Sequence, residues 1–135
     1  MNKKELIEKW ISEFASNVDE KSLNRCVLSK TNFLWHLFSF ELVSAIEGEE
    51  AKKAFDNLEY EEAIKFYEES WNKDRINKIS IVGKISSKEI DTEEESDVYI
   101  VAKDFSWTYV KTHEDGWYGP YFYKKNWETK SIVKN

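Results

Sequence analysis

The feature of this sequence that most limits its fold is a change in the spacing of its apolar residues. In the first half, apolar residues recur at intervals of three and four, as they do on one face of a helix. The clearest such stripe predicts a helix over residues 3–16 and consists of Leu6, Ile7, Trp10, Ile11 and Phe14. From Asn77 onward the spacing changes to two, which is typical of strands. Helices followed by strands predict an α+β fold, in which N-terminal helices pack on a C-terminal antiparallel sheet arranged as a meander.

The remainder of the first half predicts further helices. Asp19 or Ser22 can cap a short one. Residues 33–46 are apolar on several sides, and their length favours a buried helix. Residues 49–58 resume a helical stripe with acidic residues in its first turn. Residues 60–67 fit both a helix, which we favour, and an edge strand.

The second half predicts strands and one helical turn, over residues 87–90. The predicted strands cover residues 79–83, 98–102, 105–113 and 121–123. No Pro- or Gly-rich linker separates the two halves, so the 135 residues are predicted to form one domain, 1–135. Residues 129–135 are expected to be a frayed tail.

Composition excludes several classes of protein and site. A lone Cys26 excludes a disulfide framework and any zinc site with several thiolates. The net charge of −6 argues against a nucleic-acid binder and against a polybasic membrane binder. Four glycines and no phosphate-cradling loop leave no signal for a nucleotide, and we predict no cofactor.

No targeting or membrane-spanning segment is recognisable in the sequence. Residues 1–14 lack the continuous apolar run of a secretion signal. The longest apolar-rich stretch, residues 33–40, is far shorter than a transmembrane helix. We therefore expect a cytoplasmic protein that has no membrane partner.

The negative charge lies in one half of the chain. Residues 1–70 hold 15 acidic and 9 basic residues, whereas residues 71–135 hold 11 of each. A solvated helix surface explains this acidity, and so does a patch that attracts a basic partner. Both interpretations remain open from the sequence.

The later strands carry more aromatic rings than one covered face of a sheet can hide. Ten of the 30 residues from 98 to 127 are aromatic. Because antiparallel sheets often bury one face, some rings should stay exposed and contact another molecule, although a core of cross-strand aromatic pairs is the structural alternative. The leading hypothesis is a non-catalytic protein-interaction module, of an immunity or inhibitor type, that binds a basic protein; contacts within a homo-oligomer are a further alternative. The candidate binding residues are Trp107, Tyr109, His113, Trp117, Tyr118, Tyr121 and Tyr123.

A second hypothesis is a small-ligand or hydrolytic pocket at the end of the strand 105–113. There His113 would act as a general base oriented by a carboxylate, for which Glu114 is the nearest candidate. The aromatic walls would be Trp107, Tyr109 and Tyr121. Such a pocket requires that His113 and a carboxylate open onto the same concavity. If His113 instead closes a hydrogen-bond network at the strand end, its role is structural.

A metal site is a third interpretation of the same residues. A metal would need His113, Glu114 or Asp115 together with His36 or Glu47, which lie far apart in the sequence. A lone histidine in an apolar segment, as at His36, is typical of a buried core residue. We therefore predict no metal site, and we favour a non-catalytic role.

Four segments carry a resemblance to a known family: residues 34–40 (LWHLFSF), 47–56 (EGEEAKKAFD), 97–114 (DVYIVAKDFSWTYVKTHE) and 119–122 (GPYF). Together they make the chain similar to a domain-of-unknown-function family, number 4275, of small cytosolic proteins from Bacillus and its relatives. The resemblance implies a bacterial, cytosolic protein, and it implies no established activity. In that family a second histidine often stands where this chain has Lys111, so a His-x-His metal pair is missing here.

Overall fold

The N-terminal helix forms where the apolar stripe predicts it. The computed structural model describes residues 1–69, 75–93, 96–114 and 116–125. Helix α1 (Lys3–Phe14) begins at a capping box, in which the Asn2 side chain accepts from the Glu5 N–H and the Glu5 carboxylate accepts from the Asn2 N–H. The predicted tail at 129–135 and Asp115 lie outside the described residues.

The described residues form four further helices, all short. Helix α2 (Glu20–Cys26) begins at Asp19, whose side chain accepts a hydrogen bond from the Ser22 N–H at 2.9 Å. Helix α4 (Glu49–Asp56) and helix α5 (Ser87–Asp91) confirm two further predictions.

Residues 33–46 follow a bent path, and the predicted long helix is wrong. Within this segment only α3 (His36–Ser39) is helical, and Glu41 turns the chain with a φ of 57°. The segment is apolar on several sides because side chains from its turns, as well as from α3, enter the core. These buried residues are Phe33, Leu34, Trp35, Leu37 and Phe38.

The strands form one six-stranded antiparallel sheet in the described residues, which confirms the α+β fold. The strands are β1 (Ile46–Glu47), β2 (Glu62–Glu68), β3 (Ile76–Gly83), β4 (Asp97–Ala102), β5 (Trp107–Lys111) and β6 (Tyr121–Lys124). Their order across the sheet is β1-β6-β5-β4-β2-β3. The meander therefore covers β4 to β6, while β2 lies between β4 and β3.

The segment predicted as a helix over residues 60–67 is strand β2, and it is not an edge strand. It pairs with β3 on one side and with β4 on the other. Ala63 and Tyr67 pack on one side of the sheet, and Ile64 and Phe66 pack on the other. Because both faces carry apolar side chains, the two sets together imitate the spacing of a helix. Paired on both sides and buried on both faces, β2 loses the clean alternation of a half-exposed strand.

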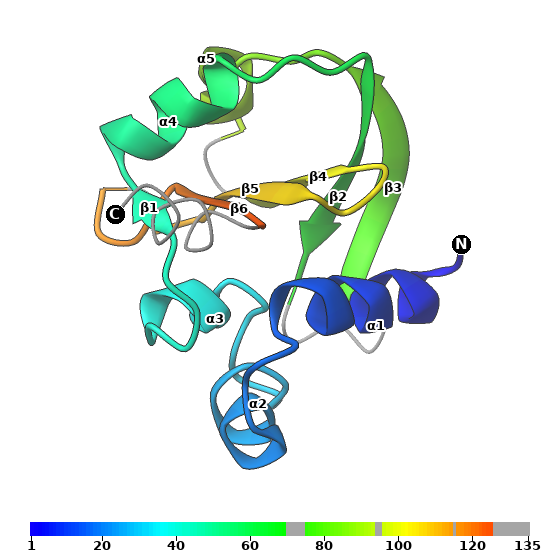
Figure 1. The fold of residues 1–135 in the computed structure, drawn as a ribbon, viewed down its shortest axis with the longest axis vertical. Coiled ribbons are helices and arrows are strands. Elements are labelled where there is room, and N and C mark those ends of the chain that lie inside the picture. Colours follow the sequence, from blue (N-terminus) through cyan, green and yellow to red (C-terminus); the bar gives the residue numbers. More distant parts are fainter. Residues whose placement is uncertain (70–74, 94–95, 115, 126–135) are drawn as a thin grey trace, which may run out of the picture.

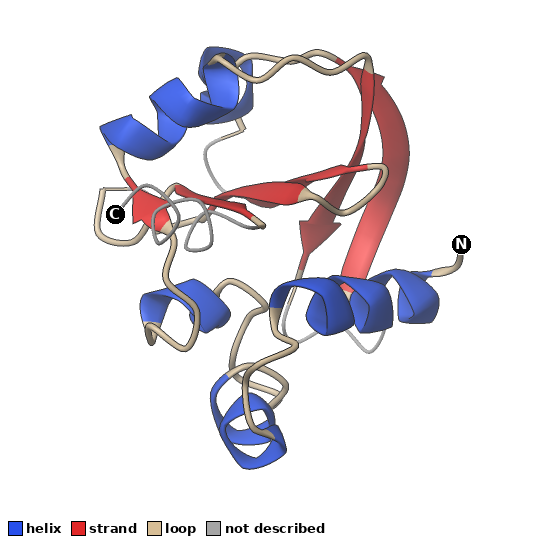
Figure 2. Ribbon diagram, in the orientation of Figure 1, coloured by secondary structure: helices blue, strands red, loops and turns tan. Residues whose placement is uncertain are grey.

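Helices cover both faces of the sheet. Helices α1, α2 and α3 lie on one side, and α4 and α5 lie on the other (Figure 1, Figure 2). The first core joins α1 and the 33–38 segment to sheet residues such as Tyr99 and Val110. The second core joins α4 and α5 to the opposite face, including Tyr109. The expectation of a single covered face is therefore wrong.

Candidate functional site

Three of the predicted binding rings lie inside the protein. Tyr109 stacks on Phe55 of α4, with ring centroids 4.2 Å apart and planes 13° apart, and Trp107 meets the same phenyl ring edge-on. Tyr121 enters the opposite core beside Phe38. None of the three is more than 5% exposed, so these rings cannot contact a partner at the surface of the folded chain.

The loop between β5 and β6 holds two other predicted rings in solvent. Trp117 is 85% exposed and Tyr118 is 47% exposed. The Thr112 hydroxyl donates to the Tyr118 carbonyl at 2.6 Å. The N–H groups of Trp117 and Tyr118 both donate to the Glu114 carbonyl at 2.9 Å. These hydrogen bonds join the two ends of the loop beside the residues that carry both rings.

The same loop is tied to the chain segment that precedes α4. The Gly119 N–H donates to Glu47 Oε2 at 3.0 Å, and the Gly48 N–H donates to the Pro120 carbonyl at 2.9 Å. Gly119 has a φ of 79°, and a Cβ there would lie 3.3 Å from two neighbouring side chains. This position requires glycine both for its backbone conformation and for its space.

Rings from residues 35–40 continue the exposed surface of the loop. The Tyr118 ring centroid lies 5.9 Å from that of the buried Trp35, which stacks on His36 at 4.2 Å. His36 stacks in turn on Phe40 at 5.2 Å, and Phe40 is 53% exposed. We call His36, Phe40, Trp117 and Tyr118 the aromatic patch.

His36 is half-buried in this patch instead of being a core residue. Its Nδ1 accepts a hydrogen bond from the Phe33 N–H at 2.8 Å. Burial lowers the pKa of His36, while the Phe33 backbone and the nearby Glu114 and Asp97 carboxylates act to raise it. The remaining candidate ring, Tyr123, is partly buried at the edge of the first core.

His113 is oriented by a carboxylate, but the carboxylate is Asp97 and not the predicted Glu114. Asp97 begins β4, and His113 lies just beyond the end of β5. The His113 N–H donates to Asp97 Oδ1 at 2.6 Å, and the ring Nδ1 lies 2.8 Å from the same oxygen. The Asp97 side chain is 2% exposed and that of His113 is 36% exposed. Burial raises the pKa of Asp97, and the hydrogen bonds from His113 oppose this rise.

Sequence reasoning missed Asp97 because the pair depends on strand register. Asp97 lies 16 positions before His113, and pairing of Val98 with Lys111 brings the two together. The His113 ring also packs on Phe33, with ring centroids 5.1 Å apart, which links the pair to the segment that carries the aromatic patch.

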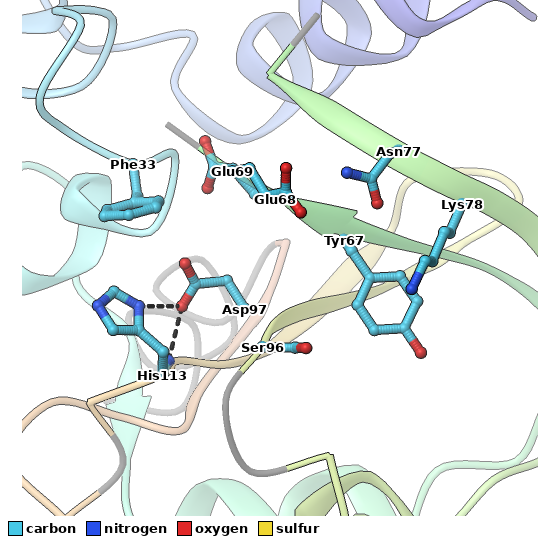
Figure 3. Close-up of a pocket in the computed structure, with 9 residues that line it drawn as sticks. All are labelled: Phe33, Tyr67, Glu68, Glu69, Asn77, Lys78, Ser96, Asp97 and His113. Atoms are coloured by element: carbon cyan, nitrogen blue, oxygen red, sulfur yellow. Dashed lines mark hydrogen bonds and ion pairs between the residues drawn. The ribbon is translucent and has the colours of Figure 1, made fainter. Parts of the chain in front are cut away.

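His113 and Asp97 line one cavity of about 180 Å³ between the ends of β2, β3 and β4 (Figure 3). Its lining residues are Phe33, Tyr67, Glu68, Glu69, Asn77, Lys78, Ser96, Asp97 and His113. Figure 3 shows the three carboxylates between His113 on one side and Lys78 on the other. The predicted walls Trp107, Tyr109 and Tyr121 do not line this cavity, whereas the predicted histidine does.

Glu68 is the most deeply buried carboxylate at the cavity, with its side chain fully inaccessible. It accepts hydrogen bonds from the Leu34 N–H, from Arg75 Nε at 2.8 Å and from the Tyr99 hydroxyl. Burial raises the pKa of Glu68 to about 7, against the opposing effects of Arg75, Tyr99 and Leu34. Arg75 also donates to the Asn32 carbonyl at 2.7 Å, so this cluster fastens the loop before α3 onto the sheet.

Neither a metal cluster nor a membrane-spanning helix is found in the described part of the chain. No three His, Cys, Asp or Glu side chains among these residues are arranged to hold a metal ion. No helix among them has both the length and the apolar character needed to cross a membrane. Cys26, at the end of α2, is a free, partly buried thiol.

Comparison with known proteins finds one family. It is described as a domain of unknown function (DUF4275), and the match covers residues 3–122. The matched region runs from the start of α1 into β6 and includes His113, Asp97 and the aromatic patch. No curated protein and no solved structure matches the chain.

Proposed function

The chain belongs to the DUF4275 family, and we propose that it is a non-catalytic protein-interaction module that binds a basic protein through the aromatic patch. The observation that carries this proposal is the 85% exposure of Trp117 on an internally braced loop. Exposed aromatic rings on a preorganised surface are typical of the residues that dominate protein interfaces. A cluster of such rings on a protein surface is a mark of an interaction site.

Carboxylates around the patch support a basic partner. Glu41 follows Phe40 directly, Glu114 precedes the loop, and Glu47 accepts the Gly119 N–H. All three residues are exposed, and the chain has a net charge of −6. Such a surface speeds association with a basic protein and disfavours an acidic one. An inhibitor or immunity role, in which binding itself blocks the partner, fits this small acidic chain.

A cytoplasmic location is part of the proposal. Cys26 is a free thiol, as is usual for proteins in reducing compartments.

Affinity capture from the native host tests the proposal. We expect the wild-type chain to enrich a basic protein, with the enrichment reduced at high salt because charge pairs are screened. The double variant Trp117→Ala, Tyr118→Ala should lower the affinity of the purified pair by at least about tenfold. The matched control is Ile81→Ala, which truncates a 53% exposed apolar residue on β3, away from the patch.

Two results would contradict this function. One is capture that does not depend on Trp117 and Tyr118. The other is sedimentation showing that the chain associates only with itself through these rings, which would make the patch an oligomer contact.

A small-ligand pocket at His113 is the second candidate function. It is favoured by one observation, that His113 and the buried Asp97 line the same cavity. If the pocket hydrolyses its ligand, Asp97 would orient the His113 imidazole through Nδ1, and Nε2 would exchange a proton with the ligand.

A thermal-shift screen against a library of small metabolites tests the pocket. A true ligand should raise the melting temperature of the wild type but not of a His113→Ala variant. Glu114→Gln is the control, because Glu114 is exposed and lies outside the cavity lining. If every hit raises the melting temperatures of the wild type and of His113→Ala equally, the small-ligand function is wrong.

A further inference from the structure

We propose that the aromatic patch binds its basic partner while His36 is neutral and releases it when His36 gains a proton. The inference rests on the protein-interaction function proposed above, and it names how that interaction is regulated. His36 is one of two histidines in the chain, and histidine is the side chain whose charge changes most readily between pH 5 and pH 8.

The position of His36 places any charge that it gains inside the patch. Its ring stacks on the buried Trp35 at a centroid distance of 4.2 Å and on the exposed Phe40 at 5.2 Å. Tyr118 packs on the same Trp35 ring, at 5.9 Å. A protonated His36 therefore adds a positive charge beside rings that the partner would contact. A basic partner would meet a charge of its own sign there, which lowers the affinity.

The hydrogen bond at Nδ1 shows that His36 is neutral in this structure. The Phe33 N–H donates to Nδ1 at 2.8 Å, so the lone pair of this nitrogen is occupied and the one ring proton is on Nε2. The Phe33 carbonyl oxygen lies 3.3 Å from the same nitrogen. A second proton, on Nδ1, would turn the nitrogen from an acceptor into a donor, which the Phe33 carbonyl can accept.

Protonation would thus leave the Phe33 N–H without its partner. Phe33 is only 9% exposed, and a buried N–H that loses its acceptor is costly. The lost hydrogen bond is also the one that holds the imidazole between Trp35 and Phe40. The patch therefore loses support for Phe40 at the same step at which it gains a repulsive charge, and both changes oppose binding.

The groups around His36 place this change in mild acid. Burial is the largest effect and lowers the pKa of His36 below its ordinary value of 6.5. The Phe33 backbone and the carboxylates of Glu114 and Asp97 act to raise this pKa, and the Arg75 guanidinium acts to lower it. The neutral ring, and with it the binding surface, is therefore kept at pH 7 and is lost as the pH falls below about 6.5.

An NMR titration of the chain alone, from pH 8 to pH 5, tests the first step. At pH 8 the ring nitrogen signals of His36 should be those of the tautomer protonated at Nε2. As the pH falls, the amide signal of Phe33 should move with the same midpoint as the His36 ring. The Ser22 amide is the control, because it donates to the Asp19 carboxylate, whose pKa is lowered so that it stays ionised throughout.

An octa-arginine peptide, whose charge is constant over this range, then serves as the basic probe. Its binding to the patch is followed through the amide signals of Trp117 and Tyr118. We expect the affinity of the wild type to fall by about fivefold between pH 7.5 and pH 5. His36→Asn should lose less than about twofold, because asparagine does not titrate and its Oδ1, as many bonds from the backbone as Nδ1, can accept the Phe33 N–H.

Two further variants separate His36 from other groups that could titrate in this range. His113 is the second histidine, and burial raises the pKa of Glu68 to about 7. His113→Gln and Glu68→Gln should both keep the loss of peptide affinity that the wild type shows at pH 5.

The inference is overturned if the wild type binds the peptide equally well at pH 7.5 and pH 5, or if His36→Asn loses as much affinity as the wild type. It is also overturned if the Phe33 amide does not follow the His36 ring, a measurement that needs no variant. Each of these results leaves the interaction function in place. A peptide that fails to bind the patch at pH 7.5 instead contradicts that function, and the inference falls with it.

Discussion

Hydrogen bonds between residues far apart in the sequence hold the segments of this protein together, and Glu68 makes several of them. Its carboxylate accepts from the Leu34 N–H at 2.9 Å and from Arg75 Nε at 2.8 Å. The Tyr99 hydroxyl donates to it from the neighbouring strand. Because every partner is a donor, the group is satisfied although it is buried, and its protonation state affects the stability of the whole chain.

Replacing Glu68 should change how stability depends on pH. Between about pH 4.5 and pH 7 native Glu68 holds a proton that the unfolded chain has released, because burial raises its native pKa to about 7. This contribution to stability is fully present below about pH 4.5 and is lost as the pH rises through 7. Glu68→Gln does not titrate. The unfolding free energy of the wild type minus that of the variant should therefore fall by up to ~3 kcal/mol between about pH 5 and pH 8.

Urea unfolding at four pH values across that range gives both free energies. Glu62→Gln is the control, because it removes a carboxylate from the same strand whose side chain is 55% exposed instead of buried. A Glu68→Gln difference that does not change with pH would show that Arg75 keeps Glu68 ionised throughout.

At the scale of elements, the loop between β5 and β6 places the rings of Trp117 and Tyr118 at the surface. Its hydrogen bonds begin at Thr112, which is fully buried and bridges the two arms of the loop. Its Oγ1 donates to the Tyr118 carbonyl at 2.6 Å and accepts from the Glu114 N–H at 3.2 Å. The loop that carries the exposed rings is therefore held by a buried side chain.

Thr112→Val should loosen this loop without changing its surface. The change keeps the shape of the side chain and removes its hydroxyl, so two polar groups lose their partner at a cost of about 1–3 kcal/mol. We expect faster amide hydrogen exchange at Glu114 and its neighbours in the loop, together with a lower free energy of unfolding.

Thr92→Val is the matched control, since the Thr92 hydroxyl also donates to a backbone carbonyl, at the exposed end of α5. Unchanged exchange at Glu114 in the Thr112→Val variant would show that the loop holds its shape by other means.

At the scale of the whole molecule, the sheet separates two cores, and both should contribute to stability. Phe55→Ala removes a fully buried ring that stacks on Tyr109 in the second core, and it should cost about 3–5 kcal/mol. Phe40→Ala makes the same change at a 53% exposed residue and should stay within about 0.5 kcal/mol of the wild type. Both values come from urea unfolding. Equal effects of the two variants would mean that α4 does not cover a true core.

The covered second face also explains how much of the fold could be predicted from the sequence. The sequence predicts helix α1 from its local apolar stripe. It predicts β4 and β5, although both are buried at every position, from their content of β-branched and aromatic residues. Residues 33–46 and β2 were not predicted, because segments buried on several sides lose the periodicity that separates helices from strands.

The candidate site, like the fold, could be predicted from the sequence only where it depends on local properties. Exposure on a turn-rich loop is a local property, and Trp117 and Tyr118 were among the predicted binding residues. Burial of Trp107 depends on which helix covers the sheet, and pairing of His113 with Asp97 depends on register. Both are set by contacts distant in the sequence, which a single sequence does not reveal.

The order of strands in this sheet has a consequence for how the chain is made. Strand β2 needs β4 as a neighbour, and both cores close on β4, β5 and β6. Ribosomes synthesise those three strands after all five helices, so the helix faces that pack on these strands are made before the strands that cover them. Nascent chains stalled before residue 97 should therefore depend on chaperones, and release of β6 from the ribosome marks the point at which that dependence ends.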